Sequence, residues 1–370
     1  MIKKFKSFMK RVLIRIKTKS VKLENTHKLD NLYLEYRQFI SRHRDITYEP
    51  RILTENLGSE KYKWVGGVYN KSQFVCFPNG SSQLLIADNA GTSKINVGTG
   101  AYKWTGGCIY NKNIYAFPRR KESFLKFKTE EKRAEEVVVG CKYEGEHHYG
   151  GECTENGIVY QPPRNCDHIL KTDLNTGICY KLQLTPGILD LKFRYCGSIL
   201  HPNGFIYFFP EEPGKVIKLN PTNDSWYFIS KKIYLPVYDA KVGCNGNIYG
   251  FSNYGKGILK IDVEHDQVKV LYETLETGAY GTKLGINGRM YSIPGDSMTV
   301  WEFDPETEKC KSFYKLRNNG KAKYAGGATG TDGTIYFTPA NAETLMILEA
   351  KGNGYNIPDY LYTYFFKDCY

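Results

Sequence analysis

The chain has 370 residues, of which 41% are hydrophobic, so it can bury a sizeable core and is not disordered as a whole. Its formal net charge of +12 lies mainly in residues 1–23, which hold nine Lys and Arg and no acid, whereas residues 51–370 hold 38 basic and 34 acidic side chains. The body of the protein therefore lacks the basic surplus of a protein that tracks nucleic-acid phosphates, and we expect no nucleic-acid partner.

Residues 1–45 are predicted to form a basic, amphipathic helical arm. Apolar residues recur at helical spacing over residues 2–16, with Lys and Arg on the other face. Its apolar runs are too short for the core of a signal peptide, about 7–15 residues, or for a membrane span of about 20 residues. Residues 1–20 can lie on an anionic membrane surface, dock on the body, stay a solvated tail or act as an organelle-targeting peptide. A second amphipathic run predicts a helix over residues 29–43 that packs on the body.

From residue 60 onward, one pattern of about forty residues recurs seven times. Each copy has an aromatic residue, a small or Gly pair, a turn, an apolar-Tyr strand that usually ends in Pro, and then an apolar-Lys-apolar-Asp strand. Periods of this length are typical of solenoids and propellers. The last residues of the second strands are Pro78, Pro118, Pro163, Pro210, Ser252, Pro294 and Pro339.

Turn chemistry favours the propeller. Asn-Gly or Asp-Gly lies between two short apolar runs in five copies, at residues 156–157, 203–204, 245–246, 287–288 and 332–333. These pairs supply the positive φ angles of two-residue hairpins, so each copy predicts four antiparallel strands. We therefore predict an all-β fold, a seven-bladed β-propeller of four-stranded antiparallel blades.

The propeller is expected to span residues 46–353. Either a strand from residues 46–53 or the C-terminal segment must close the ring. We favour the N-terminal strand as the outer strand of blade seven. The Tyr-rich tail, residues 354–370, would then pack on the rim of the propeller.

Two copies, "NGRMYSIP…TVWEFDPET" and "NGIVYQPP…HILKTDLNTG", carry Asn-Gly-x-apolar-aromatic followed by an apolar strand that ends in Asp. Over residues 60–350 the blades resemble the virginiamycin B lyase-type propeller repeat and, more distantly, the kelch repeat. The resemblance implies a propeller fold and, for a lyase, a metal-assisted elimination that uses His and Glu near the central channel. No repeat position here supplies such a pair, so the activity is not carried over.

Each copy places an aromatic residue at the start of its innermost strand. These residues are either wedges between blades or a ring around one mouth of the channel, where they could stack on sugars or hold anionic groups. If the third repeat is aligned on its glycine pair instead of on its proline, His148 takes the aromatic position in place of Tyr149. The ring comprises Trp64, Trp104, Tyr149, Tyr195, Tyr238, Tyr280 and Tyr324, and the basic residues just before it include Lys63, Lys103, Arg194 and Lys323.

The loops between the second and third strands of blades two and three are rich in arginine. They carry Arg119, Arg120 and Arg164, whereas the corresponding loops elsewhere are neutral or acidic. Such a patch predicts bidentate capture of phosphate, carboxylate or sulfate, and the alternative is a solvated basic loop.

Support for catalysis or a metal is thin in the sequence. The ten cysteines include no C-x-x-C pair, and we expect reduced thiols in a cytosolic protein, with some disulfides in an oxidising compartment as the alternative. The one adjacent histidine pair, His147 and His148, is followed by Glu152, a trio that could hold a metal or act as acid and base. We expect no resident metal or cofactor.

The sequence therefore favours a non-enzymatic binding scaffold whose basic, aromatic face holds an anionic small molecule, glycan, glycolipid head group or protein segment. We expect a cytoplasmic monomer, with membrane contact through the arm as a further hypothesis. The alternatives are a propeller enzyme of the lyase or hydrolase kind that uses His147, His148 and Glu152, and a protein-interaction hub.

Overall fold

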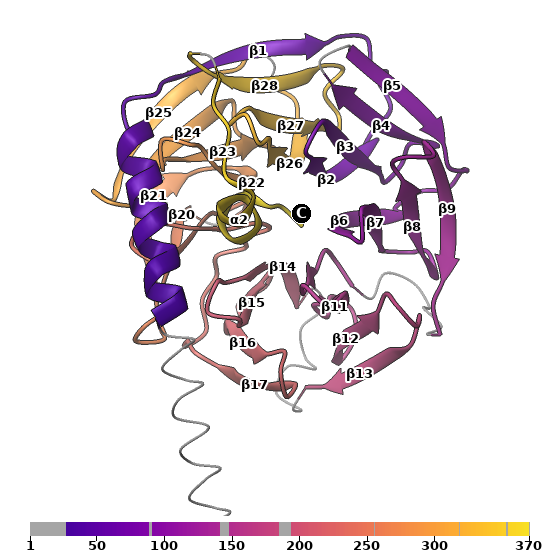
Figure 1. The fold of residues 1–370 in the computed structure, drawn as a ribbon, viewed down its shortest axis with the longest axis horizontal. Coiled ribbons are helices and arrows are strands. Elements are labelled where there is room, and N and C mark those ends of the chain that lie inside the picture. The colour runs from indigo at the N-terminus through magenta and orange to yellow at the C-terminus, as the bar shows by residue number, and fades with distance from the viewer. Residues whose placement is uncertain are drawn as a thin grey trace, which may run out of the picture.

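The computed structural model describes residues 27–88, 91–140, 148–184, 194–254, 256–317, 319–352 and 354–369. Within these residues the strands form seven four-stranded antiparallel sheets around a central axis, as Figure 1 shows. The chain is a seven-bladed β-propeller, as its repeats predict.

Blades one to six each run outward from the axis in chain order. Blade one comprises β2 (Trp64–Asn70), β3 (Gln73–Pro78), β4 (Gln83–Asp88) and β5 (Gly91–Asn96). Blade two comprises β6 (Trp104–Tyr110), β7 (Asn113–Pro118), β8 (Ser123–Lys128) and β9 (Arg133–Val138). Blade three comprises β10 (Glu152–Cys153), β11 (Ile158–Gln161), β12 (His168–Asp173) and β13 (Cys179–Gln183).

The next three blades repeat this order. Blade four comprises β14 (Tyr195–Leu200), β15 (Ile206–Pro210), β16 (Ile217–Asn220) and β17 (Ser225–Phe228). Blade five comprises β18 (Lys241–Val242), β19 (Ile248–Phe251), β20 (Lys256–Asp262) and β21 (Gln267–Glu276). Blade six comprises β22 (Ala279–Leu284), β23 (Met290–Pro294), β24 (Thr299–Asp304) and β25 (Lys309–Lys315).

Blade seven closes the ring with strands from both ends of the sequence. Its inner strands are β26 (Tyr324–Thr329), β27 (Ile335–Pro339) and β28 (Leu345–Ala350), and β1 (Tyr48–Thr54) pairs antiparallel with β28 as the outer strand. This pairing confirms the prediction that a strand from the N-terminal segment closes the ring. Backbone hydrogen bonds therefore tie the first part of the propeller to the last.

Burial follows the position of each strand in its blade. On β3, Phe74 and Val75 point to opposite faces of the sheet, and both are 0% exposed because blades pack on both faces. The outer strand β5, by contrast, has no buried residue. The core therefore lies between adjacent blades and around the axis, and the outer strands form the rim.

The glycine pair of the repeat forms a β-bulge in the innermost strand. In blade one the pairing register shifts between Trp64 and Gly67, and Gly66 has a φ of 76°, in the left-handed region that favours glycine. In blade two, a Cβ on Gly107 would lie 2.4 Å from the ring of Phe77 in the preceding blade. The pair thus bends the strand and lets neighbouring blades approach closely.

The Asn-Gly turns lie between the first and second strands as predicted, but the prediction of two-residue loops is wrong. In blade three, the N–H of Gly157 donates to Thr154 O, and the N–H of Thr154 donates to Ile158 O. Gly157 has a φ of 82°, so the loop is a three-residue turn with glycine in the left-handed position. Two-residue turns with two positive φ angles occur in blade two, at Asn111 and Lys112.

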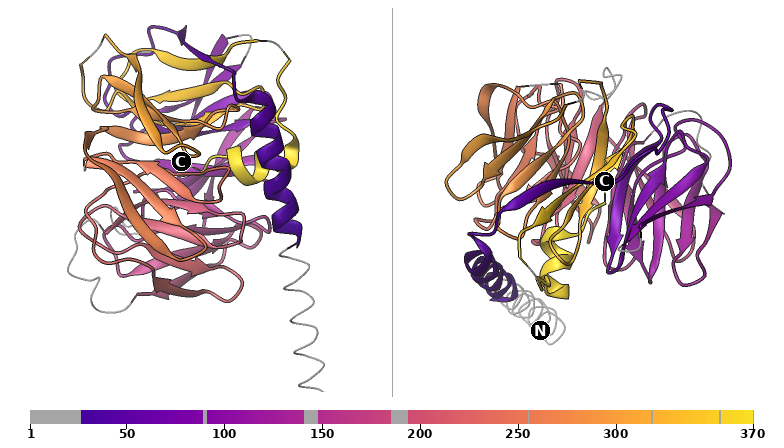
Figure 2. Two further views of the ribbon diagram at one scale, coloured as in Figure 1. Left: turned by 90° about the vertical axis from the view of Figure 1, so that its left-hand side faces the viewer. Right: turned by 90° about the horizontal axis from the view of Figure 1, so that it is seen from above.

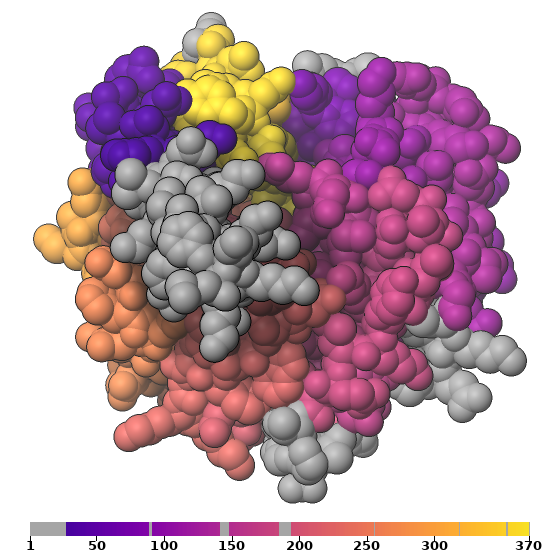
Figure 3. All heavy atoms as spheres, turned by 60° about the horizontal axis from the view of Figure 1, so that its bottom comes forward, coloured from indigo at the N-terminus to yellow at the C-terminus, as the bar shows by residue number. Residues whose placement is uncertain are grey.

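Both terminal segments lie on one end of the propeller, as Figure 2 shows. Residues 27–43 are helical, which confirms the helix predicted there, and the C-terminal segment contains α2 (Asp359–Leu361) and the π-helical turn η1 (Tyr362–Phe366). The buried ring of Tyr36 stacks on Phe365 with centroids 3.8 Å apart, and Figure 3 shows the helix beside the C-terminal segment. The helix therefore packs on the body through the C-terminal segment.

The basic run of residues 1–20 lies outside the described residues. Among the described residues, no helix is both long enough and apolar enough to cross a membrane.

Candidate functional site

The tryptophans of the repeated Lys-Trp motif are buried inside their blades. Trp64 and Trp104 are 1% and 0% exposed. Their indole Nε1 atoms donate to the backbone oxygens of Gln83 and Ser123, at 2.7 and 2.8 Å. Because these acceptors begin the third strand of the same blade, each indole ties the first strand to the third.

Tyr195 and Tyr324 take the same place in blades four and seven. Both are 2% exposed, and their hydroxyls bond to Lys215 O and Thr344 Oγ1, each at 2.9 Å. Four of the seven predicted ring residues therefore pack within blades. For these four residues the structure supports the packing role, which the sequence predicts as the alternative to ligand binding.

The other three aromatic residues close one end of the channel. In blades three and six, His148 and Ala279 pair with the proline of the repeat, so Tyr149 and Tyr280 lie one residue later along their strands. A one-residue shift sends a strand side chain to the opposite face. The ring centroids of Tyr149 and Tyr280 lie 5.6 and 5.5 Å from that of Tyr238, and the three cluster with residues of blades one, four and seven. We call this the tyrosine end of the channel.

The lysines of the motif cap backbone carbonyls. Lys103 is 1% exposed, and its Nζ donates to Ser81 O at 2.7 Å and Gly100 O at 2.8 Å. Burial lowers its pKa to about 8. Lys63 and Lys323 are equally buried and donate to backbone oxygens in the same way. In blade four, Arg194 donates to the backbone oxygen of Cys166.

The arginines of blades two and three lie near the tyrosine end. The guanidinium carbons of Arg119 and Arg120 lie 4.6 and 4.5 Å from the ring centroid of Tyr102, and Arg119 also lies 4.8 Å from that of Tyr149. Arg120 is exposed and Arg119 is half-buried. We call Tyr102, Arg119 and Arg120 the arginine patch. Arg164 also lies over the ring of Tyr149, 4.5 Å from its centroid, but it is 9% exposed and pairs with the carboxylate of Glu211 at 3.0 Å.

Of the predicted trio His147, His148 and Glu152, His147 lies outside the described residues, and the other two make separate contacts. The Nε2 of His148 contacts Cys166 Sγ, whereas the carboxylate of Glu152 accepts from Ser198 Oγ at 3.2 Å. The His-Glu pair that the lyase resemblance implies for a metal near the channel is therefore not assembled among the described residues, and we derive no step through such a metal.

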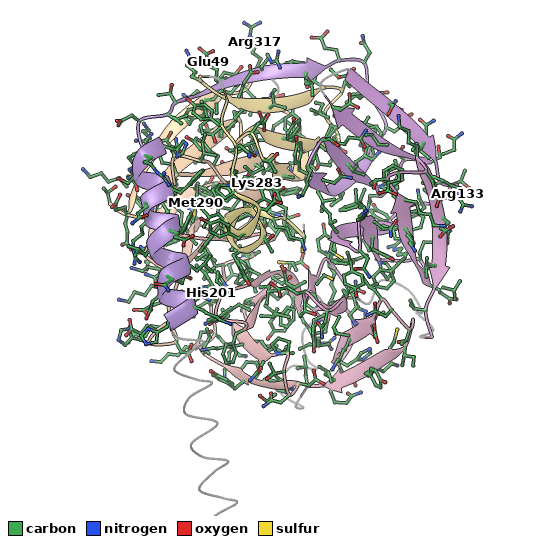
Figure 4. The ribbon with its side chains drawn as sticks, in the orientation of Figure 1. Glu49, Arg133, His201, Lys283, Met290 and Arg317 are labelled. Carbon is green, nitrogen blue, oxygen red and sulfur yellow. The ribbon has the colours of Figure 1, made fainter. Side chains whose placement is uncertain are left out.

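At the opposite end of the channel, two buried lysines pair with two buried aspartates. Asp368, of the C-terminal segment, lies 2.6 Å from the ammonium groups of both Lys241 and Lys283, and Lys283 also pairs with Asp239. All four side chains are at most 6% exposed, and Figure 4 shows Lys283 near the centre of the ring. Burial lowers the pKa of Lys241, but Asp368 and Asp239 outweigh it and raise the pKa overall. We call this the tail end; it shows that the C-terminal segment reaches the axis rather than the rim.

A cavity of about 720 Å³ opens at the tail end. Glu152, Ser198 and Lys241 contribute to its lining from the innermost strands of blades three, four and five. Tyr364 and Phe365 of the C-terminal segment line it as well. The cavity is thus walled by three blades and by a segment more than a hundred residues away in the sequence.

Glu152 is a titratable group of this cavity whose pKa lies near neutral pH. It is 8% exposed, and burial raises its pKa to about 7, against the opposing effect of Lys241. Its carboxyl group is therefore present in both protonation states at neutral pH, and it can donate or accept a hydrogen bond. His201, also in the lining, is held neutral because burial lowers its pKa to about 4.

Sequence reasoning missed the cavity because it searched the repeated positions. The cavity depends on residues that are not repeated, above all those of the C-terminal segment. A signal was nevertheless present: Glu152, Lys241 and Lys283 are charged residues in innermost strands, where buried positions are expected.

No family model matches the chain, and no curated protein matches its sequence. Among solved structures, a streptogramin B lyase is 14% identical with a TM-score of 0.68, over 82% of this chain and 98% of the lyase. Virginiamycin B lyase from Staphylococcus aureus is 12% identical with a TM-score of 0.66, over 82% of this chain and 99% of that one. An extracellular domain assigned to a one-component system of B. thetaiotaomicron is 12% identical with a TM-score of 0.63, over 83% of this chain and 40% of that one.

At sequence identities this low, structural similarity shows that the folds are alike and nothing about activity. The similar structures include both enzymes and an extracellular domain. The resemblance to virginiamycin B lyase-type propellers is confirmed at that level: the chain has the seven-bladed fold of these lyases.

Proposed function

We propose that the protein is a ligand-binding β-propeller that takes a small, uncharged, partly apolar molecule in the cavity at the tail end of the channel. The cavity itself supports this proposal, because about 720 Å³ lies within the range of about 300–1,000 Å³ typical of small-molecule sites. Its position at the junction of three blades and the C-terminal segment means that it forms only in the folded chain.

The charges around the cavity largely compensate one another, which favours a neutral ligand. Lys241 is compensated by Asp368, Lys283 by Asp239 and Asp368, and Lys171 of the lining by Asp224. Lys367, also in the lining, donates to the backbone oxygen of Ile109. The carboxyl group of Glu152 can bond to a donor or an acceptor of the bound molecule. The apolar walls would receive the rest of that molecule.

A cavity-filling variant tests the site. We expect members of a neutral fragment library to bind the full chain, measured by saturation-transfer NMR. Leu200 lines the cavity, so Leu200→Trp should remove this binding, while Ile178→Trp, at a position 49% exposed outside the lining, should keep it. Equal binding to the wild type and to both variants would place the fragments elsewhere and contradict the proposal.

An enzymatic version of the proposal would use Glu152 as the acid or base, since its pKa lies near neutral pH. It predicts that a bound compound is chemically changed by the wild type and is bound but unchanged by Glu152→Gln. Mass spectrometry of the compound after incubation separates the two versions. Recovery of the unchanged compound from both proteins supports binding alone.

The arginine patch carries a second candidate function, the binding of an anionic ligand. The stacking of both guanidinium groups on Tyr102 supports it, because it holds two planar, positively charged donors side by side. We expect the Arg119→Ala, Arg120→Ala double variant to elute from heparin-agarose at lower salt than Arg133→Ala, a control at the rim. Elution at the same salt would remove this candidate.

Membrane contact through residues 1–20 stays a prediction. Co-sedimentation with anionic vesicles should fall when residues 1–20 are deleted, because each Lys or Arg near such a surface contributes about 1 kcal/mol. Unchanged co-sedimentation would contradict it. The monomeric state, the cytoplasmic location and the hub alternative also stay predictions.

A further inference from the structure

A cluster of metal-binding side chains lies in blade three, apart from the cavity and the charges of the tail end. One ligand atom each from His148, Cys166 and His168 lies within 4.8 Å of the others. His148 forms an isolated bridge with Pro163 ahead of β10, Cys166 lies in the loop between β11 and β12, and His168 begins β12. The fold therefore brings together a Cys-x-His pair and a histidine eighteen residues before the cysteine.

The distance between two of these ligand atoms matches a tetrahedral zinc site. Zinc bonds of about 2.0 Å to nitrogen and about 2.3 Å to sulfur place the two ligand atoms about 3.5 Å apart. The distance from His148 Nε2 to Cys166 Sγ is 3.4 Å. The ring centroids of His148 and His168 lie 5.3 Å apart, a separation that lets one nitrogen of each ring face the same region beside Cys166.

The outer contacts of the cluster also resemble those of a metal centre. His168 Nδ1 bonds to the carboxylate of Asp167 at 2.8 Å, which leaves Nε2 as the ring atom for a metal. A carboxylate behind a histidine fixes the ring orientation and makes the histidine a stronger ligand. His148 and His168 are 2% and 8% exposed, so few rotamers are lost on binding.

The charges near the cluster suit a thiolate-bound dication. Zinc with one thiolate and two neutral imidazoles carries a net charge of +1, and the Asp167 carboxylate compensates it. Of the nearby cations, Arg164 is compensated by Glu211, whereas Arg194 donates to the backbone oxygen of Cys166 and keeps its positive charge beside the thiol.

We propose that His148, Cys166 and His168 form a three-ligand site for zinc(II). The choice of zinc follows from the ligands, because two imidazoles and one thiolate suit a borderline-soft ion and not magnesium or calcium. Three protein ligands leave one tetrahedral position for water or for a donor atom of a bound molecule. The Cys-x-His pair was visible in the sequence, but the third ligand could be matched to it only through the fold.

The test uses the full chain, stripped of metal by chelation and then titrated with cobalt(II), a coloured substitute for zinc. We expect stoichiometric binding, with a thiolate-to-cobalt charge-transfer band and the intense visible bands of tetrahedral coordination. Cys166→Ser should remove the charge-transfer band. Cys310→Ser, a half-buried cysteine of blade six, should retain it.

The variant Asp167→Asn keeps the proposal testable if substitution of a ligand residue prevents folding. Asp167 is half-exposed and not a ligand, and we expect this variant to weaken zinc binding by about 10–100-fold, measured by competition with a chromophoric chelator. His265→Ala, an exposed histidine on blade five, is the matched control. Absence of stoichiometric cobalt, or a charge-transfer band that survives Cys166→Ser, would overturn the proposal.

Discussion

The two ends of the channel are closed in different ways. At the tyrosine end, Tyr149, Tyr238 and Tyr280 fill the axis with uncharged rings, and the repeated lysines cap nearby backbone carbonyls. At the tail end, Asp368 arrives from the C-terminal segment and compensates two buried lysines. The repeat therefore builds one end, and a single non-repeated segment completes the other and leaves a cavity there.

The largest effect is expected from breaking the charge network of the tail end. Asp368→Asn leaves Lys241 without its closest carboxylate in a buried site, which should lower the free energy of unfolding by about 3–5 kcal/mol. Urea denaturation measures the loss. Asp359→Asn is the matched control: its carboxylate also pairs with a lysine but is 73% exposed, so we expect a change of at most about 0.5 kcal/mol. Equal losses would show that Asp368 does not hold the tail end.

We expect Glu152 to make the free energy of unfolding depend on pH. Burial raises its pKa from 4.5 to about 7, so between these values the folded state holds a proton that the unfolded state has lost. The stability of the wild type therefore falls as the pH rises from about 4.5 to 7.

Glu152→Gln removes this titration. At pH 8 the variant should be more stable than the wild type by on the order of 2–3 kcal/mol, and at pH 4.5 the two should be similar. Urea denaturation of both proteins at the two pH values measures the difference. A stability difference that does not change with pH would show that Glu152 ionises normally.

A smaller effect is expected at the tyrosine end. Lys103→Met keeps the apolar stem but removes the donors to Ser81 O and Gly100 O, at a cost of about 1–2 kcal/mol in the free energy of unfolding. Lys112→Met is the control, because that lysine is 84% exposed. Thermal unfolding compares the two, and an unchanged midpoint for Lys103→Met would mean that the lysine is not structural.

The smallest effect on stability is expected from the arginine patch. Arg120 is exposed and stacks on Tyr102, so Arg120→Ala should change the free energy of unfolding by about 0.5 kcal/mol or less. The same denaturation experiment measures it. A loss as large as that of Lys103→Met would make the patch part of the scaffold and weaken its assignment to ligand binding.

Much of the fold could be predicted because the residues that recur in every repeat indicate local structure, such as a bulge, a strand or a turn. The glycine doublet marks a bulge, the apolar strands mark blades, and a strand from residues 46–53 was correctly expected to close the ring. The roles of the seven aromatic residues could not be separated. Trp104 and Tyr149 look equivalent in the sequence, yet a shift of one residue sends Trp104 into its blade and Tyr149 to the axis.

The sequence by itself determined the number of blades, their strands and the helix at residues 29–43, because period, alternation and turn residues act over a few neighbouring positions. Only the tertiary structure decided which end of the channel holds the cavity, and which histidine joins Cys166 and His168. These features join residues far apart in the chain, such as Lys241 with Asp368 and His148 with Cys166, and no local pattern records which of them will meet.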